Sequence, residues 1–172
     1  MNKLMWIDLE MTGLDVQKEV IIEVAVVVTN LKMEHIENYH SIVKQPQSYL
    51  DQMDEWNTNQ HGASGLTDLV PSGQAPHLVE KDLVELCQKH FADEKVIIAG
   101  NSIAQDRLFI DKYFKDFSNL LHYRMLDVSS FKLVFNNIYR YTYNKKSTNH
   151  RALEDIEESI NELKAYMSHI KI

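Results

Sequence analysis

Two acidic residues, Asp8 and Glu10, lie two positions apart near the start of the chain. The residues around them alternate between apolar and other side chains, which predicts a β-strand with both carboxylates on one face. Two like charges held side by side cost free energy unless they share a cation or a proton. The pair therefore indicates either a site for a cation or, more simply, an edge strand with a solvated acidic face.

Three further residues could complete such a site. Asp106 follows a turn at residues 100–102, Asp155 is expected in the first turns of the last helix, and His150 shortly precedes it. Sites in α/β sheets form where strand ends meet helix starts, so we expect these groups to converge. Magnesium prefers carboxylate oxygens, and two such ions can clamp the attacking and leaving oxygens of a phosphodiester. A neutral histidine nearby could take a proton from the attacking water.

Each of these residues also has a simpler explanation. Asp106, and in part Asp155, could be first-turn acids that the helix dipole favours. His150 could be a surface or capping residue. The spacing of the residues alone leaves both interpretations open.

The elements that must position these residues are predicted to be a run of strands first, and then strands that alternate with helices. We predict strands over residues 4–10, 20–29, 35–43, 96–99 and 123–128, and helices over 50–59, 77–91, 106–113 and 129–135. A final helix from about residue 151 has Ile156, Ile160, Leu163 and Met167 on its apolar face, and residues 61–65 and 136–149 are expected to be loops, the second of them mobile. An antiparallel meander followed by alternating strands and helices predicts a mixed sheet flanked by helices, an α/β domain over residues 1–172.

Composition limits the kinds of function. The net charge of −7 argues against a protein that grips long nucleic acid, because affinity for a polyanion comes from many lysine and arginine contacts. This net charge remains compatible with a substrate that has few phosphates, or with a site in which bound divalent cations supply the positive charge. The lone Cys87 suits a reducing compartment, no apolar run is long enough to span a bilayer, and no signal peptide is evident, so we expect a cytoplasmic protein.

Several short motifs follow one another along nearly the whole chain. They are DLEMTGLD at residues 8–15, WN at 56–57 with HGASGL at 61–66, GNSI at 100–103 with DR at 106–107, YR at 123–124 with DVS at 127–129, and HRA at 150–152 with DI at 155–156 and ESI at 158–160. This set closely resembles oligoribonuclease, in the histidine-containing branch of the DEDD exonuclease superfamily. The resemblance implies a ribonuclease H-like fold and 3′-to-5′ removal of nucleotides from very short RNA, dinucleotides above all, with release of 5′-monophosphates.

The resemblance also implies roles for individual residues. Asp8, Glu10 and Asp155 match ligands of one of two Mg²⁺ or Mn²⁺ ions, with Asp8 bridging to the second ion. Asp106 matches the acid that supports the second ion, and His150 matches the general base. These are the implied catalytic and metal-binding positions.

Further positions match the family's contacts with substrate. Leu14 corresponds to a wedge between the two bases, and Trp56 and His61 to contacts with the 3′ nucleotide. The other implied substrate positions are Met11 and Thr12 in the first motif, Ser102, Arg124 and Ser129 as a cap on the 5′ phosphate, and Tyr123 against the 5′ base. The resemblance implies a homodimer in which Tyr123 and Arg124 reach the neighbouring site. Taken singly, Leu14 and Trp56 could instead pack in the core, and Tyr123 with Arg124 could be a structural pair at an edge strand.

Two other functions remain open at this point. A related exonuclease could trim the 3′ ends of longer RNA or DNA, which a basic surface track would favour and the net charge disfavours. Loss of any matching acid would support a non-catalytic dimeric adaptor, yet all five matching positions are filled. Residues 136–149 are shorter and more aromatic than the usual family connection, which places a departure from the family directly before His150.

Overall fold

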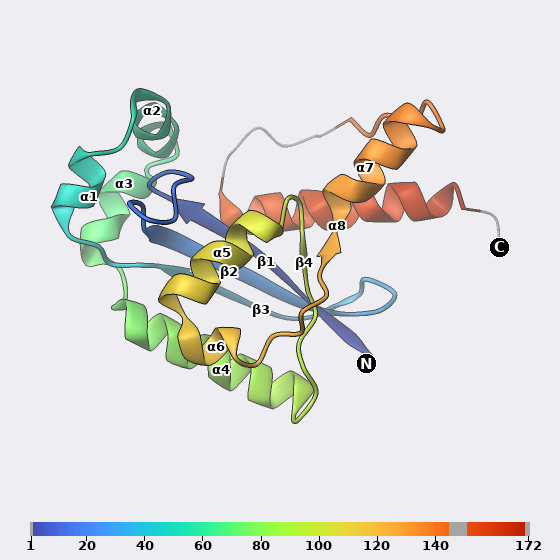
Figure 1. Cartoon of the computed structure of the whole chain (residues 1–172), viewed down its shortest axis with the longest axis horizontal. Coiled ribbons are helices and arrows are strands. Elements are labelled where there is room, and N and C mark those ends of the chain that lie inside the picture. Colours follow the sequence, from blue (N-terminus) through green and yellow to red (C-terminus); the bar gives the residue numbers. More distant parts are fainter. Residues whose placement is uncertain (1, 145–150, 171–172) are drawn as a thin grey trace.

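The structure is a computed structural model, and it describes residues 2–144 and 151–170. Within that part of the chain, the centre is a five-stranded sheet in the order β3-β2-β1-β4-β5 (Figure 1). The strands are β1 (Lys3–Met11), β2 (Ile21–Asn30), β3 (His35–Ile42), β4 (Ile98–Gly100) and β5 (Leu126–Asp127). β1, β2 and β3 form an antiparallel meander, and β4 and β5 run parallel to β1. This arrangement confirms the predicted mixed sheet of an α/β fold.

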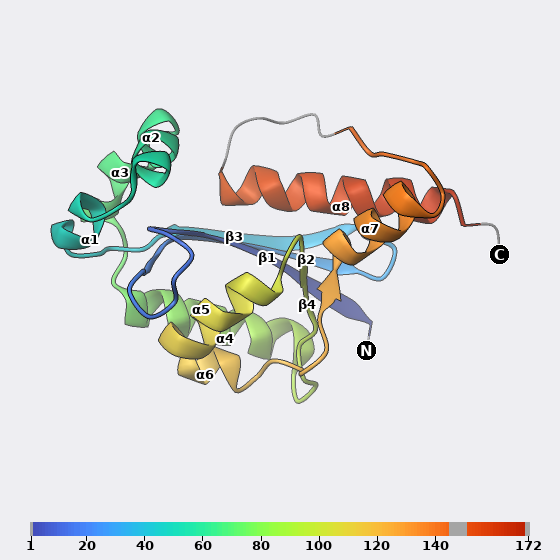
Figure 2. The ribbon, with the colours of Figure 1, turned by 45° about the horizontal axis from the view of Figure 1, so that its top comes forward.

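Helices cover both faces and one end of the sheet. On one face lie α4 (Pro76–Phe91), α5 (Ala104–Tyr113) and α6 (Lys115–Ser118), and on the other lie α7 (Val128–Asn137) and α8 (Ala152–Ser168) (Figure 2). Beyond the C-terminal end of β1 lie α1 (Gln47–Asp51), α2 (Glu55–Ala63), α3 (Leu66–Leu69) and the 3₁₀ turn η1 (Val70–Ser72) (Figure 1).

The alternation of β1 divides its side chains between two cores. Met5, Ile7 and Leu9 pack in the cluster that includes α4 and α5, whereas Leu4 and Trp6 pack in the cluster beneath α8. Asp8 and Glu10 have the same phase as Trp6, so they emerge on the α8 face. β1 pairs with β2 on one side and with β4 on the other. The edge-strand interpretation of the acidic pair is therefore wrong.

Gly100 allows β4 to end close against β1. A Cβ at this position would lie 2.9 Å from the carbonyl oxygen of Ile7, which is shorter than real Cβ contacts allow. The chain then turns through Ser102, whose φ of +52° is unusual for a residue with a side chain, and enters α5. This tight exit brings the start of α5 to the C-terminal end of β1.

Local structure differs from the sequence prediction in several elements. The helix predicted over residues 50–59 is two helices, because the Asp54 carboxylate accepts a hydrogen bond from the Asn57 N–H at 2.8 Å and starts α2. α2 continues to Ala63, so the loop predicted from residue 61 begins later. The strands predicted over 96–99 and 123–128 are short strands at Ile98–Gly100 and Leu126–Asp127.

The described part of the segment predicted as a mobile loop packs against α8. α7 extends to Asn137, the Tyr141 ring meets those of Phe135 and Tyr166 edge-on, and the Tyr143 hydroxyl donates to Glu158 at 3.1 Å. The apolar face predicted for α8 included Met167, but this side chain is 39% exposed, and the neighbouring Tyr166 is buried instead. No helix within residues 2–144 or 151–170 combines the length and the apolar character needed to cross a bilayer.

Candidate active site

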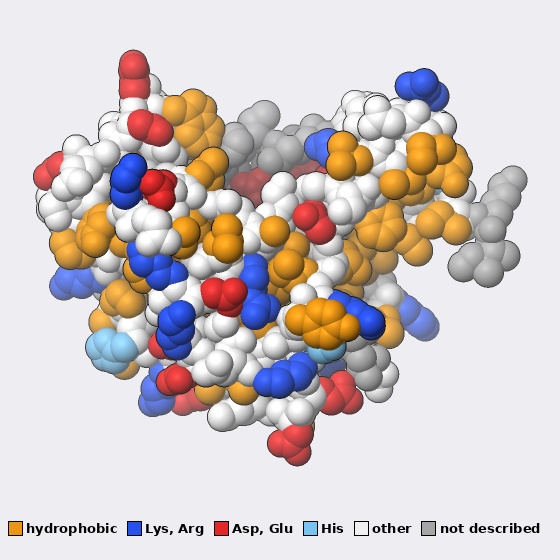
Figure 3. Space-filling model, in the orientation of Figure 1, with side chains coloured by type: hydrophobic (Ala, Val, Ile, Leu, Met, Phe, Trp, Pro, Cys, Tyr) orange, Lys and Arg blue, Asp and Glu red, His pale blue; other side chains and the backbone are white. Residues whose placement is uncertain are grey.

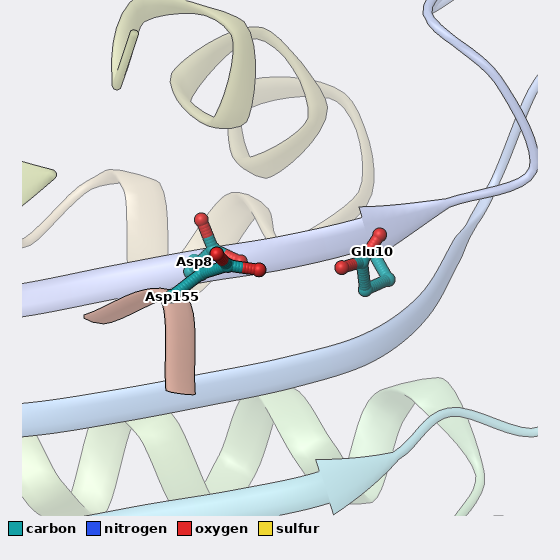
Figure 4. Close-up of side chains that lie close together, drawn as sticks. All are labelled: Asp8, Glu10 and Asp155. Carbon is teal, nitrogen blue, oxygen red and sulfur yellow. The ribbon is translucent and has the colours of Figure 1, made fainter. Parts of the chain in front are cut away.

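Three carboxylates from two elements meet on the α8 face of the sheet. Asp8 and Glu10 come from β1, and Asp155 comes from the first turns of α8 (Figure 4). One carboxylate oxygen from each lies within 4.8 Å of the other two. The strand puts its two acids on one face, and the helix crosses that face with Asp155 turned toward them. The predicted convergence of these residues is confirmed.

Asp106 approaches the same point of β1 from α5. It is buried, and its Oδ1 accepts a hydrogen bond from the backbone N–H of Leu9 at 3.0 Å. Leu9 is the residue between Asp8 and Glu10, beyond the end of the β1–β4 ladder. The Asp106 carboxylate therefore pairs with a backbone N–H of β1 that β4 does not reach. Its charge also repels that of Asp8 and so raises the pKa of Asp8. Asp106 is thus more than a first-turn acid that the helix dipole favours.

The electrostatics of these acids favour the binding of a cation. Burial, and then repulsion from Asp106, Glu10 and Asp155, raise the pKa of Asp8 well above its ordinary value. Burial and the charges of Glu23, Asp155 and Asp106 raise the pKa of Glu10 to about 8. Burial raises the pKa of Asp106 to about 7, against the hydrogen bond from Leu9. Closely spaced oxygen donors that repel one another in this way suit hard divalent cations, which choose carboxylate ligands.

The three carboxylates line a cavity of about 390 Å³. The rest of its wall comes from β1, from the β4–α5 turn, from the segment after α7 and from α7 and α8, and its residues are Leu9, Asn101, Ser102, Ser129, Lys132, Tyr143, Glu158, Ser159 and Glu162. In Figure 3 acidic side chains lie at the back of the depression between α2 and α7. The cavity is large enough for part of a short nucleic acid beside the carboxylates.

Ser102 and Ser129, two of the residues expected to hold the 5′ phosphate, form one hydrogen-bonded corner of this cavity. The Ser102 N–H donates to Asp127 Oδ1 and to Ser129 Oγ, each at 3.0 Å, and Ser129 Oγ donates to Asn101 Oδ1 at 3.1 Å. Arg124 lies outside the cavity wall and is exposed, with its guanidinium 5.2 Å from the centre of the Tyr123 ring. Both residues precede β5, and Tyr123 is 74% exposed.

The residues after Glu10 differ in what they contact. Thr12 is buried: its hydroxyl donates to Glu19 at 2.6 Å and accepts from the N–H of Val20 at 3.0 Å, so it closes the loop that follows β1. Met11 is also buried at the end of β1. Leu14 is 73% exposed, and its carbonyl oxygen accepts a hydrogen bond from Gln105 at 2.7 Å. Leu14 is therefore not packed in the core.

The two residues expected at the 3′ nucleotide have opposite environments. Trp56 on α2 is 65% exposed, which excludes the core interpretation. His61 on the same helix is buried, and its Nε2–H donates to the carbonyl oxygen of Met11 at 2.9 Å. Its Nδ1 lies 4.0 Å from Glu10. In this structure His61 supports the end of β1 beside Glu10, and its ring has no exposed face for a base. His150 lies outside the described residues.

Several site residues were missed by the sequence analysis. Lys132, Glu158 and Glu162 line the cavity, and Glu23 of β2 lies directly opposite Glu10 in the sheet. A sequence signal existed for two of them. Glu23 interrupts a run of valine and isoleucine in a buried strand, and Lys132 follows Ser129 at a spacing that keeps both on one helix face.

The comparisons with known proteins agree with this geometry. Residues 5–163 match the sequence family described as Exonuclease (RNase_T). Oligoribonuclease of Bordetella pertussis is 44% identical over 177 residues, covering 98% of this chain and 96% of the relative. The human mitochondrial oligoribonuclease is 39% identical over 174 residues, covering 98% of this chain and 73% of the relative.

Solved structures share the fold at low identity. A zinc-bound complex of E. coli exonuclease I with single-stranded DNA superposes with a TM-score of 0.78 at 13% identity, over 98% of this chain. The chain spans 41% of the length of that enzyme. This likeness confirms the ribonuclease H-like fold. Together, the family match over residues 5–163 and the two relatives show that the chain belongs to the exonuclease family and, within it, to the oligoribonucleases.

Proposed function

We propose that this protein is a 3′-to-5′ exoribonuclease that degrades very short RNA, dinucleotides above all, to nucleoside 5′-monophosphates. The observation that carries the proposal is the meeting of Asp8, Glu10 and Asp155 within 4.8 Å at the wall of a cavity, in a chain similar to oligoribonucleases over its whole length. These carboxylates would hold two Mg²⁺ or Mn²⁺ ions, with Asp106 assisting at the second. Such ions supply positive charge that stabilises the attacking and leaving oxygens of a phosphodiester.

The side chains of the chain have distinct tasks in this proposal. Asp8 and Glu10, fixed by β1, would hold the cations against which the scissile phosphate binds. Ser102 and Ser129 hold the 5′ phosphate, joined by Arg124 of a second copy of the chain. Leu14, whose side chain is exposed and whose carbonyl oxygen accepts a hydrogen bond from Gln105 of α5, separates the two bases. Trp56 offers an exposed ring to the 3′ base. His150, assigned from the sequence, is the base that takes the proton of the attacking water.

The size of the cavity and the charge of the chain support a short substrate. The cavity is about 390 Å³, with one lysine and five acids, Asp8, Glu10, Asp155, Glu158 and Glu162, on its wall. A net charge of −7 provides little attraction for a long polyanion. If Ser102 and Ser129 hold the 5′ phosphate as proposed, each nucleotide added at the 5′ end would have to displace that phosphate.

We further propose that the protein acts as a homodimer. Exposed apolar side chains gather over α7 and its C-cap (Figure 3), and they are Leu133, Val134, Ile138 and Tyr139. Burial of such a surface against a second copy would be favourable, since apolar area removed from water stabilises association. The exposed Tyr123 and Arg124 would then reach the site of the partner subunit.

Cleavage of RNA of graded length tests the proposed substrate. RNA labelled at the 5′ end, from the dinucleotide upward, is incubated with Mg²⁺ or with a chelator, and products are counted per unit time. We expect metal-dependent cleavage that is fastest for the dinucleotide and falls steeply with length. Efficient shortening of long RNA or DNA would instead assign the protein to end trimming, and tight binding without cleavage would assign it to the adaptor function.

A further inference from the structure

Glu23 on β2 is a completely buried carboxylate that has no task in the proposed reaction. It lies directly opposite Glu10 in the β1–β2 ladder. A buried charge is strongly destabilising unless partners compensate it, and like charges opposite each other in a sheet repel. A carboxylate buried at this position therefore needs partners that compensate its charge.

The principal partner of Glu23 is Arg151, the N-cap residue of α8. Arg151 donates from Nε at 2.9 Å and from Nη2 at 2.7 Å to Glu23 Oε1, which His40 Nε2 also approaches at 2.6 Å. The Ala152 N–H, in the first turn of α8, points to the other oxygen at 3.4 Å. Burial alone would raise the pKa of Glu23, but the hydrogen bonds from His40 and Arg151 outweigh it and lower that pKa.

This contact fixes the start of the helix that carries Asp155. The Asp155 N–H donates to the Arg151 carbonyl oxygen at 3.1 Å, so the clamped residue and the acid belong to the same helical turn. The N-cap of α8 has no side-chain capping bond of its own. The link to Glu23 therefore takes the place of a cap and ties this turn to the sheet.

Arg151 also compensates the charges around Glu10. Its guanidinium binds Glu23, the residue that lies directly opposite Glu10 in the β1–β2 ladder. The cation thus permits two glutamates, Glu10 and Glu23, to lie side by side. Loss of this cation would increase the repulsion that the three metal-facing acids already experience.

We propose that Glu23 and Arg151 are positioning residues for the metal site: Glu23 holds the first turn of α8 against β2, so that Asp155 meets Asp8 and Glu10 at ligand distance. This inference rests on the proposed metal-dependent activity. Neither residue touches the substrate or the ions. Groups that orient metal ligands in this way change metal affinity or activity by about 10- to 100-fold when they are removed.

The first test compares Glu23→Gln with a matched control, Glu37→Gln. Glu37 of β3 also has two cationic partners, Lys89 at 2.9 Å and His90 at 2.6 Å, but its side chain is 33% exposed and both partners come from α4 on the opposite face. Mn²⁺ affinity of the substrate-free protein is measured by calorimetry, with Tm and with kcat and KM for a dinucleotide. We expect E23Q to lose about 10-fold in Mn²⁺ affinity and in kcat with little change in KM, and E37Q to lower only Tm.

The second test is a double-mutant cycle with Arg151. We expect Arg151→Met to lose as much Mn²⁺ affinity as E23Q, Arg151→Lys to recover part of it, and the double variant E23Q/R151M to lose no more than R151M alone. Wild-type Mn²⁺ affinity in R151M and R151K, equal effects of E23Q and E37Q, or additive losses in the double variant would each overturn the inference. A wild-type protein that neither binds Mn²⁺ nor cleaves RNA would instead overturn the proposed function.

Discussion

The backbone N–H of Leu9 donates a hydrogen bond to the Asp106 carboxylate at 3.0 Å. This bond joins α5 to β1 at the residue between Asp8 and Glu10, so the fourth acid is held by the strand that carries the first two. Asp106 thus combines a structural task, the pairing of a buried N–H, with the charge that the proposed chemistry uses.

Substitution of Asp106 separates these two tasks. In Asp106→Asn the amide oxygen can still accept from Leu9, whereas Asp106→Ala leaves that N–H unpaired. We expect both variants to lose cleavage by about 100-fold, since loss of a group at the metal site has effects of this size. Only D106A should also lose stability, by about 1–3 kcal/mol in urea unfolding. Equal stability of the two variants would contradict the structural task.

Asp8→Asn tests the central carboxylate. We expect turnover of a dinucleotide to fall by about 1,000-fold, because several kcal/mol of transition-state charge stabilisation are lost. The metal-free variant should melt at a higher temperature than the wild type, since one of the mutually repelling acids is neutralised. Turnover at the wild-type rate would contradict the two-metal assignment.

The raised pKa values predict how pH changes the stability of the metal-free protein. The pKa of Glu10 is about 8 and that of Asp106 about 7, and both exceed the values of the unfolded chain. Between about pH 4.5 and pH 8 the folded state therefore holds more protons than the unfolded state, so stability falls as pH rises. In a chelator we expect Tm to be lower at about pH 8 than at about pH 5.5 by some 5 °C, which corresponds to about 2 kcal/mol.

Added Mg²⁺ provides the control for this pH effect. An ion that binds the ionised carboxylates of the folded state stabilises that state by mass action. We therefore expect Mg²⁺ to raise Tm strongly at about pH 8 and little at about pH 5.5, because the acids are protonated at the lower pH. A Tm that rises with pH in the chelator would show that these acids do not repel one another in the folded protein.

Leu14→Ala tests the contact between the bases. Leu14 is 73% exposed, so its truncation should leave Tm unchanged. We expect KM for a dinucleotide to rise by about 10-fold, which corresponds to about 1.4 kcal/mol of lost apolar contact, with a smaller change in kcat. Leu31→Ala, in the turn between β2 and β3 and 51% exposed, is the control and should leave both constants unchanged. An unchanged KM in L14A would remove the wedge assignment.

Ile138→Glu tests the proposed dimer. Ile138 is 70% exposed at the C-cap of α7, so the substitution does not disturb the core of the free chain. We expect light scattering to show a monomer for I138E and a dimer for the wild type, with cleavage lowered by about 10-fold if Tyr123 and Arg124 serve the neighbouring site. Leu78→Glu, on α4 and 42% exposed, should remain dimeric. A monomeric wild type would refute the proposal directly.

The sequence by itself determined the fold class and pointed to Asp8, Glu10 and Asp155, three of the acids that line the cavity. Alternation in β1 placed Asp8 and Glu10 on one face, helical spacing placed Ile156 and Ile160 toward the sheet, and the motif order identified the family. Local periodicity is enough for the first two conclusions, because it depends only on residues close together in the chain, whereas the family follows from the motifs and their order.

Contacts between distant segments were decided only by the tertiary structure. Sequence spacing could not reveal that Glu23 lies under the start of α8, that Asp106 accepts from Leu9, or that His61 is buried beneath Met11. It also could not divide residues 50–59 into two helices or assign Tyr141 to the core at α8. The physical reason is that burial and pairing depend on which surfaces meet when the helices pack on the sheet, and this overrides local preference.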